Sequence, residues 1–408
     1  MQRLGGVVIL MQQVLDRIAF LVGDKENLEK SASIATKEPF NCEVIDFLQS
    51  LSRKIMGIKE AKAYSDLYTF AFWIRKSSMN ELKTNLYKKD NLIRYGRGLA
   101  FHIAPSNVAV NFAYSLAVGL ITGNANVVRI PSKEYRQVDI IVNAINDLLS
   151  DFENIRPYIN LVRYERDKEI NDYLSWISDI RIIWGGDKTI ADIRNSEIRA
   201  RTTEITFADR FSLAVIDSDL YMKLEDKAGL ARDFYNDTYL SDQNACTSPR
   251  LIVWMGNCIE KARDKFWEEE YKLIKQYSLQ PVMAVNKVNK LMLLAMDNYD
   301  AKLVSNFDNR LICVKVSRLD AALMNYKESC GFFFEYNCQD ISELREICSD
   351  KGCQTVAYLG DREAIVKLLE LGIKGIDRIV KIGHTMDFNM IWDGYDLINN
   401  MTRIIYLD

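Results

Sequence analysis

The stretch that decides the fold is residues 98–132, GLAFHIAPSNVAVNFAYSLAVGLITGNANVVRIPS. Residues 98–103 are mostly apolar and predict a strand, which the Ala-Pro-Ser-Asn sequence at 104–107 ends in a turn. Residues 108–121 are apolar nearly all round and predict a buried helix, which a Thr-Gly-Asn sequence then terminates. The β-branched residues in 126–130 predict a second strand. This order predicts a βαβ unit with parallel, buried strands.

Strands and helices continue to alternate after this unit. A helix is expected over 133–152, with further strands over 158–163 and 180–184. A second α/β run begins at residue 211. Residues 1–90 place apolar side chains at spacings of three and four, which predicts helices. The expected strands of the second run cover 211–216, 251–255, 311–316, 331–336 and 355–359. The chain is therefore predicted to be an α/β protein built around mostly parallel sheets.

Length and composition indicate an ordinary globular chain. The 408 residues suffice for two domains, and the net charge of −3 argues against a nucleic-acid partner. The apolar run 5–11 is too short to cross a bilayer, and the apolar region 106–128 is interrupted by asparagines. A signal peptide is not expected, because no small-residue cleavage site follows the first run. We therefore expect a cytoplasmic protein that is not integral to a membrane.

The eight cysteines are expected to be free thiols, as in a reducing compartment. Four of them lie close together in the sequence, at 330, 338, 348 and 353. Their spacing contains no C-x-x-C pair, and residue 330 precedes an apolar run that resembles a strand. Core thiols therefore explain this group better than a structural zinc site, and we expect no metal.

Three loops of the first α/β run are candidate ligand-binding segments. They cover 104–107, 131–133 and 185–188, and each follows an expected strand. Ligands of parallel sheets bind beyond the carboxyl ends of the strands, where these loops are expected. The Gly185-Gly186 pair opens a helix whose N–H groups could hold a phosphate. The pair is a weak signal without a G-x-G-x-x-G motif, and a plain turn is the alternative for all three loops.

Cys246 is the candidate nucleophile. It lies in the sequence DQNACTSPR at 242–250, between an expected helix over 224–240 and the strand over 251–255. A structural cysteine usually lies on an apolar face, whereas this one is flanked by small residues in a polar connection. A cysteine in a loop is a candidate and not a proof, so an inert surface thiol is the alternative.

The two histidines, His102 and His384, are interpreted as hydrogen-bonded polar residues rather than catalysts. A helix C-terminus precedes the Cys246 loop and would oppose a thiolate. Arg250 or His384 is expected to offset this effect.

Four stretches together resemble the aldehyde dehydrogenase superfamily, and within it the LuxC-type long-chain fatty acyl-CoA reductases of bacterial bioluminescence. They are HIAPSN at 102–107, GNANVVRIPS at 123–132, DQNACTSPR at 242–250, and GIDRIV at 375–380 with WDGY at 392–395. The resemblance implies an aldehyde-dehydrogenase-like α/β fold, with a Rossmann-type dinucleotide-binding domain and an α/β catalytic domain. The implied divisions are an N-terminal helical region 1–90, a dinucleotide-binding domain 91–210, a catalytic domain 211–384 and a C-terminal segment 385–408.

The resemblance also implies roles for individual residues. Cys246 would be the nucleophile that takes the acyl group, and Asn107 would donate to the oxyanion beside the backbone N–H of Cys246. The residues implied to contact the dinucleotide are Pro105, Arg129, Ser132, Lys133, Gly185, Gly186 and Asp187.

Two departures from the superfamily pattern narrow the expected chemistry. Hydrolytic members carry a general-base glutamate in a Glu-Leu-Gly-Gly-Lys pattern, whereas the corresponding run here begins at Thr206 and the nearest carboxylate, Glu204, is out of register. An acyl-enzyme without this base is hydrolysed slowly, and its acyl group can instead accept a hydride. Lys133 follows Ser132 where NAD-dependent members often carry a glutamate. Lys133 and Arg129 would attract a 2′-phosphate, which favours NADPH.

The expected reaction is the NADPH-dependent reduction of a fatty acyl thioester to an aldehyde through a thioester on Cys246. The substrate would be acyl-CoA or an acyl-protein thioester, delivered in the second case by an acyl-transferring or synthetase partner. The alternatives are an aldehyde-oxidising dehydrogenase and a binding subunit without turnover. By analogy with the superfamily, a homo-oligomer is expected.

Overall fold

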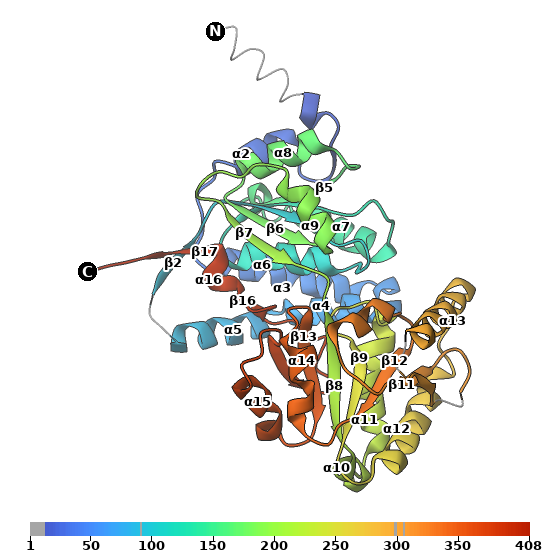
Figure 1. The fold of residues 1–408 in the computed structure, drawn as a ribbon. Helices are drawn as coiled ribbons and strands as arrows, with labels where there is room; N and C mark the ends of the chain where they lie inside the picture. The colour runs from blue at the N-terminus through green and yellow to red at the C-terminus, as the bar shows by residue number, and fades with distance from the viewer. Residues whose placement is uncertain (1–12, 90–91, 298–299, 305–306) are drawn as a thin grey trace. The chain divides into compact units, whose positions relative to one another are not determined.

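The computed structural model describes residues 13–89, 92–297, 300–304 and 307–408 (Figure 1). The chain forms two compact units, which consist of Met1–Ala208 with Tyr395–Asp408 (unit 1) and of Asp209–Gly394 (unit 2). The sequence suggested divisions after residues 210 and 384. The apolar run 5–11 lies outside the described residues. In the part of the chain that is described, no helix is long and apolar enough to cross a membrane.

Unit 1 contains a six-stranded sheet in the order β1-β5-β4-β3-β6-β7. Strands β3 to β7 are parallel, and β1 joins β5 as an antiparallel edge strand. The order β5-β4-β3-β6-β7 is that of a doubly wound Rossmann sheet, in which the chain direction reverses between β3 and β6. The strands are β1 (Ala19–Val22), β3 (Leu99–Ile103), β4 (Ala125–Arg129), β5 (Ile159–Arg163), β6 (Ile180–Trp184) and β7 (Thr203–Phe207). The predicted strands at 98–103, 126–130, 158–163 and 180–184 are thus confirmed.

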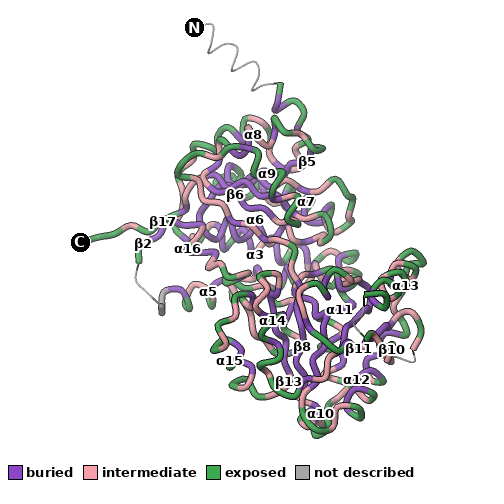
Figure 2. Tube along the Cα trace, in the orientation of Figure 1, coloured by how far each residue is buried: buried purple, intermediate pink, exposed green. Residues whose placement is uncertain are grey.

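Helices lie on both faces of this sheet, with α2 and α8 on one side and α3 and α6 on the other (Figure 1). The central strands are buried along their length (Figure 2). The apolar space that Leu51, Leu116 and Ile141 help to line is too small for a water molecule, so α6 packs as core. The helices of unit 1 are α2 (Lys25–Ser31), α3 (Cys42–Gly57), α4 (Ser65–Trp73), α5 (Lys76–Lys89), α6 (Asn111–Ile121), α7 (Arg136–Leu148), α8 (Lys168–Ile177), α9 (Asp187–Arg194) and α16 (Leu397–Met401).

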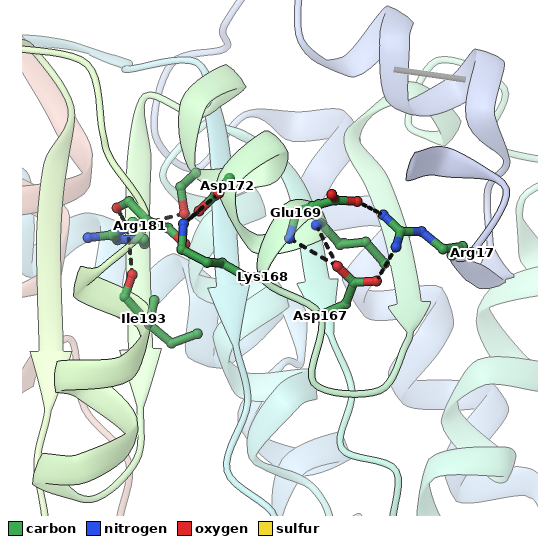
Figure 3. A network of polar contacts seen from close by, with 10 residues as sticks. Arg17, Asp167, Lys168, Glu169, Asp172, Arg181 and Ile193 are labelled. Atoms are coloured by element: carbon green, nitrogen blue, oxygen red, sulfur yellow. Dashed lines mark hydrogen bonds and ion pairs between the residues drawn. The ribbon is translucent and has the colours of Figure 1, made fainter. Parts of the chain in front are cut away.

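The N-terminal region departs from the expected run of helices. Residues Ala19–Val22 form strand β1, so the prediction of helix over 1–90 is wrong there. The strand has four residues, too few to show an alternating pattern, and its pairing with β5 forms it. Arg17, just before β1, contacts Asp167 at 2.9 Å and Glu169 at 2.6 Å at the start of α8 (Figure 3).

A second antiparallel pair joins segments far apart in the sequence. Strand β2 (Ile93–Gly96) pairs with β17 (Thr402–Ile405), so a strand near the C-terminus completes unit 1. Asn124 donates from its side-chain amide to the carbonyl of Met401 at 2.9 Å and ties this pair to the end of α6. Unit 1 also contains the two-residue strand β16 (Tyr395–Asp396).

Unit 2 contains a seven-stranded sheet in the order β10-β11-β12-β9-β8-β13-β14. All neighbouring strands are parallel except the edge pair β10 and β11. The strands are β8 (Phe211–Asp217), β9 (Pro249–Met255), β10 (Lys302–Leu303), β11 (Ile312–Lys315), β12 (Phe332–Asn337), β13 (Cys353–Leu359) and β14 (Arg378–Lys381), with β15 (Ile391–Trp392) outside the sheet. The helices are α10 (Ser218–Lys223), α11 (Lys227–Thr238), α12 (Ile259–Ile274), α13 (Pro281–Met296), α14 (Arg345–Ser349) and α15 (Arg362–Glu370).

Alternate residues of each strand enter two separate cores. In β8, Leu213 belongs to the core that contains Leu294 of α13, whereas Ala214 belongs to the core that contains Phe266 of α12. Cysteines 330, 338, 348 and 353 are all buried, which confirms the prediction of core thiols. Both faces of the sheet are covered, and the apolar character of its strands follows from this.

Candidate active site

Cys246 lies in the connection between α11 and β9, immediately before the strand begins at Pro249. The predicted helix-to-strand connection is therefore confirmed. The side chain is partly exposed, and the hydroxyl of Ser212 on β8 donates to the carbonyl of Cys246 at 2.8 Å. The thiol thus sits at the amino ends of two adjacent parallel strands, β8 and β9.

Gln243 fixes the backbone of this loop. It is fully buried and adopts a left-handed conformation with φ 56°. Its amide nitrogen donates to the carbonyls of Pro249 (3.0 Å) and Phe332 (3.2 Å), and its amide oxygen accepts from the N–H groups of Gly331 (3.0 Å) and Phe332 (3.1 Å). One side chain therefore joins the nucleophile loop to the starts of β9 and β12. The role of Gln243 was not predicted. Its only signal in the sequence is its place in the quoted loop, three positions before Cys246.

Arg250 completes the support of the loop. Its guanidinium donates to the backbone carbonyls of Glu328 and Gln243, each at 2.5 Å. The arginine is thus engaged by backbone oxygens. His384 is exposed and its Nδ1 lies 2.7 Å from a carboxylate oxygen of Asp387. Arg210, which was not expected from the sequence, lowers the pKa of the thiol, and the charge of Cys246 also acts on Arg250 and Arg378.

Arg210 joins several segments at the amino edge of the unit 2 sheet. It forms an ion pair with Asp377, lies 3.8 Å from Asp393, and donates to the carbonyls of Cys353 (2.8 Å) and Gly375 (2.7 Å). Arg210 directly precedes β8, and Asp377 directly precedes β14. The sheet order β9-β8-β13-β14 brings these residues together although they are far apart in the sequence.

Burial raises the pKa of the Cys246 thiol to about 12, and the negative charge of Asp393 adds to this effect. Arg210 opposes the rise. A thiol with this pKa carries its proton at neutral pH, so the proton must leave during a nucleophilic attack.

Asp393 is itself a perturbed carboxyl group. Its side chain is 4% exposed, accepts a hydrogen bond from the amide of Gln354, and belongs to a residue with φ 47°. Burial raises the pKa of Asp393 to about 6, against the opposing effects of Arg210 and Arg378. A carboxyl group with a pKa near neutrality can accept and donate a proton at physiological pH.

The predicted dinucleotide-binding residues lie at the carboxyl edge of the unit 1 sheet. They follow three adjacent strands, β4, β3 and β6, and this edge includes the point where the chain direction reverses. Tyr135 links two of the loops, since its hydroxyl donates to the carbonyl of Ser106 at 2.7 Å. The residues at this edge are Pro105, Asn107, Arg129, Ser132, Lys133, Gly185, Gly186 and Asp187, and the side chain of Asn107 is exposed.

The groups at this edge fit a phosphorylated ligand in part. Gly186 is the N-cap residue of α9 and has no side chain with which to cap it, so the first-turn amides are left to another partner. Lys133 is exposed, with its ammonium 4.7 Å from the ring centre of Tyr135. Arg129 is less accessible, because it stacks on Tyr164 and donates to the Tyr164 carbonyl at 3.3 Å. Asp187, in the first turn of α9, would repel an anion.

His102 is a core residue. It is fully buried on β3, and its ring nitrogens lie 2.7 Å from the hydroxyl of Ser115 and 3.0 Å from the amide oxygen of Asn126. Burial lowers the pKa of His102 to about 4, against the effect of the Asn126 hydrogen bond. The ring is therefore neutral at physiological pH, and the interpretation of His102 as a hydrogen-bonded polar residue is confirmed.

Glu204, the carboxylate nearest to the expected general base, is held in place by two arginines on unit 1. It lies on β7, accepts from Arg181 at 2.8 Å and accepts from Arg194 at 2.7 Å. Arg181 in turn donates to the Ile193 carbonyl at 3.3 Å (Figure 3). Burial works against ionisation of Glu204, but the hydrogen bonds from Arg194 and Arg181 outweigh it and lower its pKa. Glu204 is therefore a structural anion.

A segment of the chain matches the model of a known protein family. Residues 75–268 match the model of the acyl-CoA reductases called LuxC. This segment belongs to the LuxC family. Residues 75–268 include the candidate catalytic and dinucleotide-binding residues, from Pro105 to Cys246, and end before His384, Asp377 and Asp393. A comparison with curated proteins finds no match.

Solved structures of low sequence identity share the fold. An oxidoreductase from Marinobacter aquaeolei is 13% identical, with 93% of this chain and 88% of that chain covered at a TM-score of 0.63. Aldehyde dehydrogenase 21 from Physcomitrella patens, solved with succinate, is 12% identical, with 93% and 88% covered at 0.62. A 3,6-anhydro-L-galactose dehydrogenase solved in complex with NAP is 11% identical, with 95% of both chains covered at 0.61. The chain thus has an aldehyde-dehydrogenase-like fold, and it is an enzyme of aldehyde and acyl-group chemistry.

Proposed function

We propose that this enzyme reduces a fatty acyl thioester, with acyl-CoA as the donor, to the aldehyde through an acyl group carried on Cys246. The observation that carries the proposal is the position of Cys246, partly exposed at the amino ends of β8 and β9 in a loop that Gln243 holds. A fixed, accessible thiol suits attack on a thioester, because one sulfur replaces another at the acyl carbon. The LuxC match over this segment supports the same chemistry.

Reduction is favoured over hydrolysis by the surroundings of Thr206. This residue replaces the expected base, and Glu204 is occupied by Arg181 and Arg194. Water attacks an acyl-enzyme slowly without a base to activate it. Asn107 is proposed as a side-chain donor to the thioester oxygen, the role that the resemblance implies. Loss of one such donor typically slows acyl transfer about 10²- to 10³-fold.

The proposed cofactor is NADPH. When bound, a reduced nicotinamide dinucleotide supplies the hydride that converts the acyl group to the aldehyde level. Gly185, Gly186 and the start of α9 would hold its phosphates, and Lys133 would hold the 2′-phosphate. Lys133 follows the second strand of the doubly wound order, β4, where NAD-binding sheets carry an acidic residue for the ribose. A positive charge at this position favours the phosphorylated dinucleotide.

Intact-protein mass spectrometry tests the proposal. Wild type and Cys246→Ala are mixed with a long-chain acyl-CoA, first without and then with NADPH, and aldehyde is measured in parallel. We expect an acyl adduct on wild type alone, which NADPH discharges as aldehyde. Discharge as free acid without cofactor would contradict the proposed reduction. Acylation by an acyl carrier protein but not by acyl-CoA would contradict the proposed donor and leave the thioester chemistry intact.

A further inference from the structure

Helix α13 carries a lysine on its buried face. Lys287 is 0% exposed, and its ammonium donates to the carbonyls of Asn309 and Cys330, each at 2.7 Å. Burial lowers the pKa of Lys287 to about 8, so the side chain is still an ammonium at pH 7. A buried charge costs free energy that an apolar side chain of similar length would avoid. The packing of α13 therefore does not explain the lysine, whereas its two carbonyl partners do.

The Cys330 carbonyl belongs to the same peptide group as the N–H of Gly331. This peptide accepts a hydrogen bond from Lys287 at its oxygen and donates one to the amide oxygen of Gln243, at 3.0 Å, from its nitrogen. A hydrogen bond to the oxygen polarises the peptide and strengthens its N–H as a donor. Both residues have positive φ, 60° for Cys330 and 85° for Gly331. Cysteine rarely adopts this conformation, so the turn depends on the contacts that hold it.

The segment around this turn also holds the rest of the nucleophile loop (residues 242–250). The N–H of Cys330 donates to the carbonyl of Asp242 at 3.0 Å, and the hydroxyl of Ser329 donates to the amide oxygen of Asn244 at 2.9 Å. With the contacts of Gln243, three consecutive residues of the loop are bound to this segment. The last of them lies two positions before the thiol.

We propose that Lys287 is a positioning residue, which fixes the place of the Cys246 thiol by holding the Cys330–Gly331 peptide. That peptide in turn holds Gln243 and with it the nucleophile loop. This inference rests on the proposed role of Cys246 as the residue that carries the acyl group. The effect of Lys287 is on the position of the sulfur, and a displacement of about 1 Å at a reacting group can slow the reaction about 10²-fold.

Lys287→Met tests the inference, because methionine is similar in length and size but cannot donate to the two carbonyls. The matched control is Lys290→Met. Lys290 lies on the same helix and also donates to a backbone carbonyl, that of Asn325 at 3.0 Å, outside the segment that holds the loop. Lys287→Arg is the conservative variant, since a guanidinium can donate to two carbonyls.

Two measurements at pH 7 compare these variants with wild type. Single-turnover release of CoA over a range of acyl-CoA concentrations gives the maximal acylation rate and the half-saturating concentration. Hydrogen exchange resolved by mass spectrometry, without substrate, reports on residues 242–250 and 328–332. A role in overall stability alone would raise exchange throughout unit 2, whereas a positioning role raises it in these two segments.

We expect Lys287→Met to lower the maximal acylation rate about 10- to 10²-fold and to leave the half-saturating concentration within about twofold. Exchange in the two segments should rise about tenfold. Lys290→Met should match wild type in both measurements, and Lys287→Arg should recover the acylation rate to within about threefold. In a Gln243→Ala background, Lys287→Met should slow acylation by less than about threefold, because the two residues act on one peptide.

Four outcomes would overturn the inference. They are equal losses in Lys287→Met and Lys290→Met, a change in the half-saturating concentration alone, an Arg variant no faster than the Met variant, and additive losses with Gln243→Ala. If Lys287→Met does not fold, Lys287→Gln, which keeps an N–H donor, takes its place with the same readouts. If wild type releases no CoA, the proposed function fails instead. Hydrogen exchange then still decides whether Lys287 holds the loop, because it needs no acyl substrate.

Discussion

The two sheets place their proposed functional residues at opposite ends of their strands. Unit 1 gathers the predicted dinucleotide-binding residues at the carboxyl ends of β3, β4 and β6, where loops lead into the N-termini of helices. Unit 2 presents Cys246 at the amino ends of β8 and β9, in a loop that leaves the C-terminal side of α11. Helix N-termini attract anions and helix C-termini repel them. Unit 1 therefore suits phosphates, whereas burial keeps the thiol of unit 2 protonated.

The largest expected effect comes from removing the nucleophile of unit 2. Cys246→Ala should abolish acylation and lower turnover by more than about 10³-fold, because the covalent route is lost. Binding of NADPH, measured by its fluorescence, should remain within about twofold, since the dinucleotide is assigned to unit 1. A large loss of NADPH binding would contradict the assignment of the dinucleotide to unit 1.

The Gln243→Ala substitution tests how far Gln243 stabilises unit 2 relative to unit 1. The substitution leaves the peptide groups that Gln243 contacts at the starts of β9 and β12 without their partner. We expect the free energy of unfolding of unit 2 to fall by about 3 kcal/mol, because buried polar groups lose their hydrogen bonds. Hydrogen exchange resolved by mass spectrometry would locate the loss in unit 2. The control is Asn244→Ala, at an exposed neighbour that accepts one hydrogen bond from Ser329 at 2.9 Å, and it should lower the stability by less.

The units are also expected to respond to pH in opposite directions. The folded-state pKa of His102 is about 4, below its ordinary value of 6.5, so the unfolded chain binds more protons between these values. Unit 1 should therefore lose about 2 kcal/mol of stability between pH 7.5 and pH 5. Burial raises the pKa of both Asp237 and Asp393 in unit 2 to about 6, above the usual aspartate value. Their contribution is fully present below pH 4 and declines as the pH rises through 6.

Hydrogen exchange at pH 5 and pH 7.5, corrected for intrinsic rates, measures this difference for each unit. His102→Gln should flatten the acid response of unit 1 and leave unit 2 unchanged. An acid response of equal size in both units, or one that persists in His102→Gln, would show that other groups dominate.

The smallest expected effect concerns cofactor choice at the carboxyl edge of unit 1. Lys133→Ala should raise the KM for NADPH about tenfold and leave that for NADH nearly unchanged, because one charge contact to a 2′-phosphate is lost. Glu134→Gln provides the matched control at the next exposed position and should not raise the KM for NADPH. Equal losses for NADPH and NADH would place Lys133 at a phosphate that both dinucleotides share.

The sequence was informative where strands are parallel and buried on both faces. Runs such as 126–130 and 180–184 are rich in β-branched residues, so their type and position were predictable. Strand β1 was missed because four residues at a sheet edge carry no pattern of their own. Strands β2 and β7 were also missed, because β2 is formed by its distant partner β17 and β7 is a partly exposed edge strand.

The candidate site was predictable only in its local parts. Cys246 and the loops of unit 1 stand out within short stretches of sequence. Arg210, which acts on the pKa of the thiol, is brought to the same sheet edge as Cys246 by the strand order β9-β8-β13-β14, which no local pattern encodes. The run at 206–210 was noted for the glutamate it lacks, while its last residue, Arg210, lowers the pKa of the Cys246 thiol.

The pairing of β2 with β17 also sets an order of events during synthesis. The ribosome makes residues 13–208 first, then all of unit 2, and only afterwards the strand Thr402–Ile405 that completes unit 1. Strand β2 must therefore wait, with one edge unpaired, while Asp209–Gly394 is translated and folds. An unpaired strand edge can join another chain in the meantime. Nascent chains stalled between residues 210 and 400 are accordingly the ones that would depend most on a chaperone.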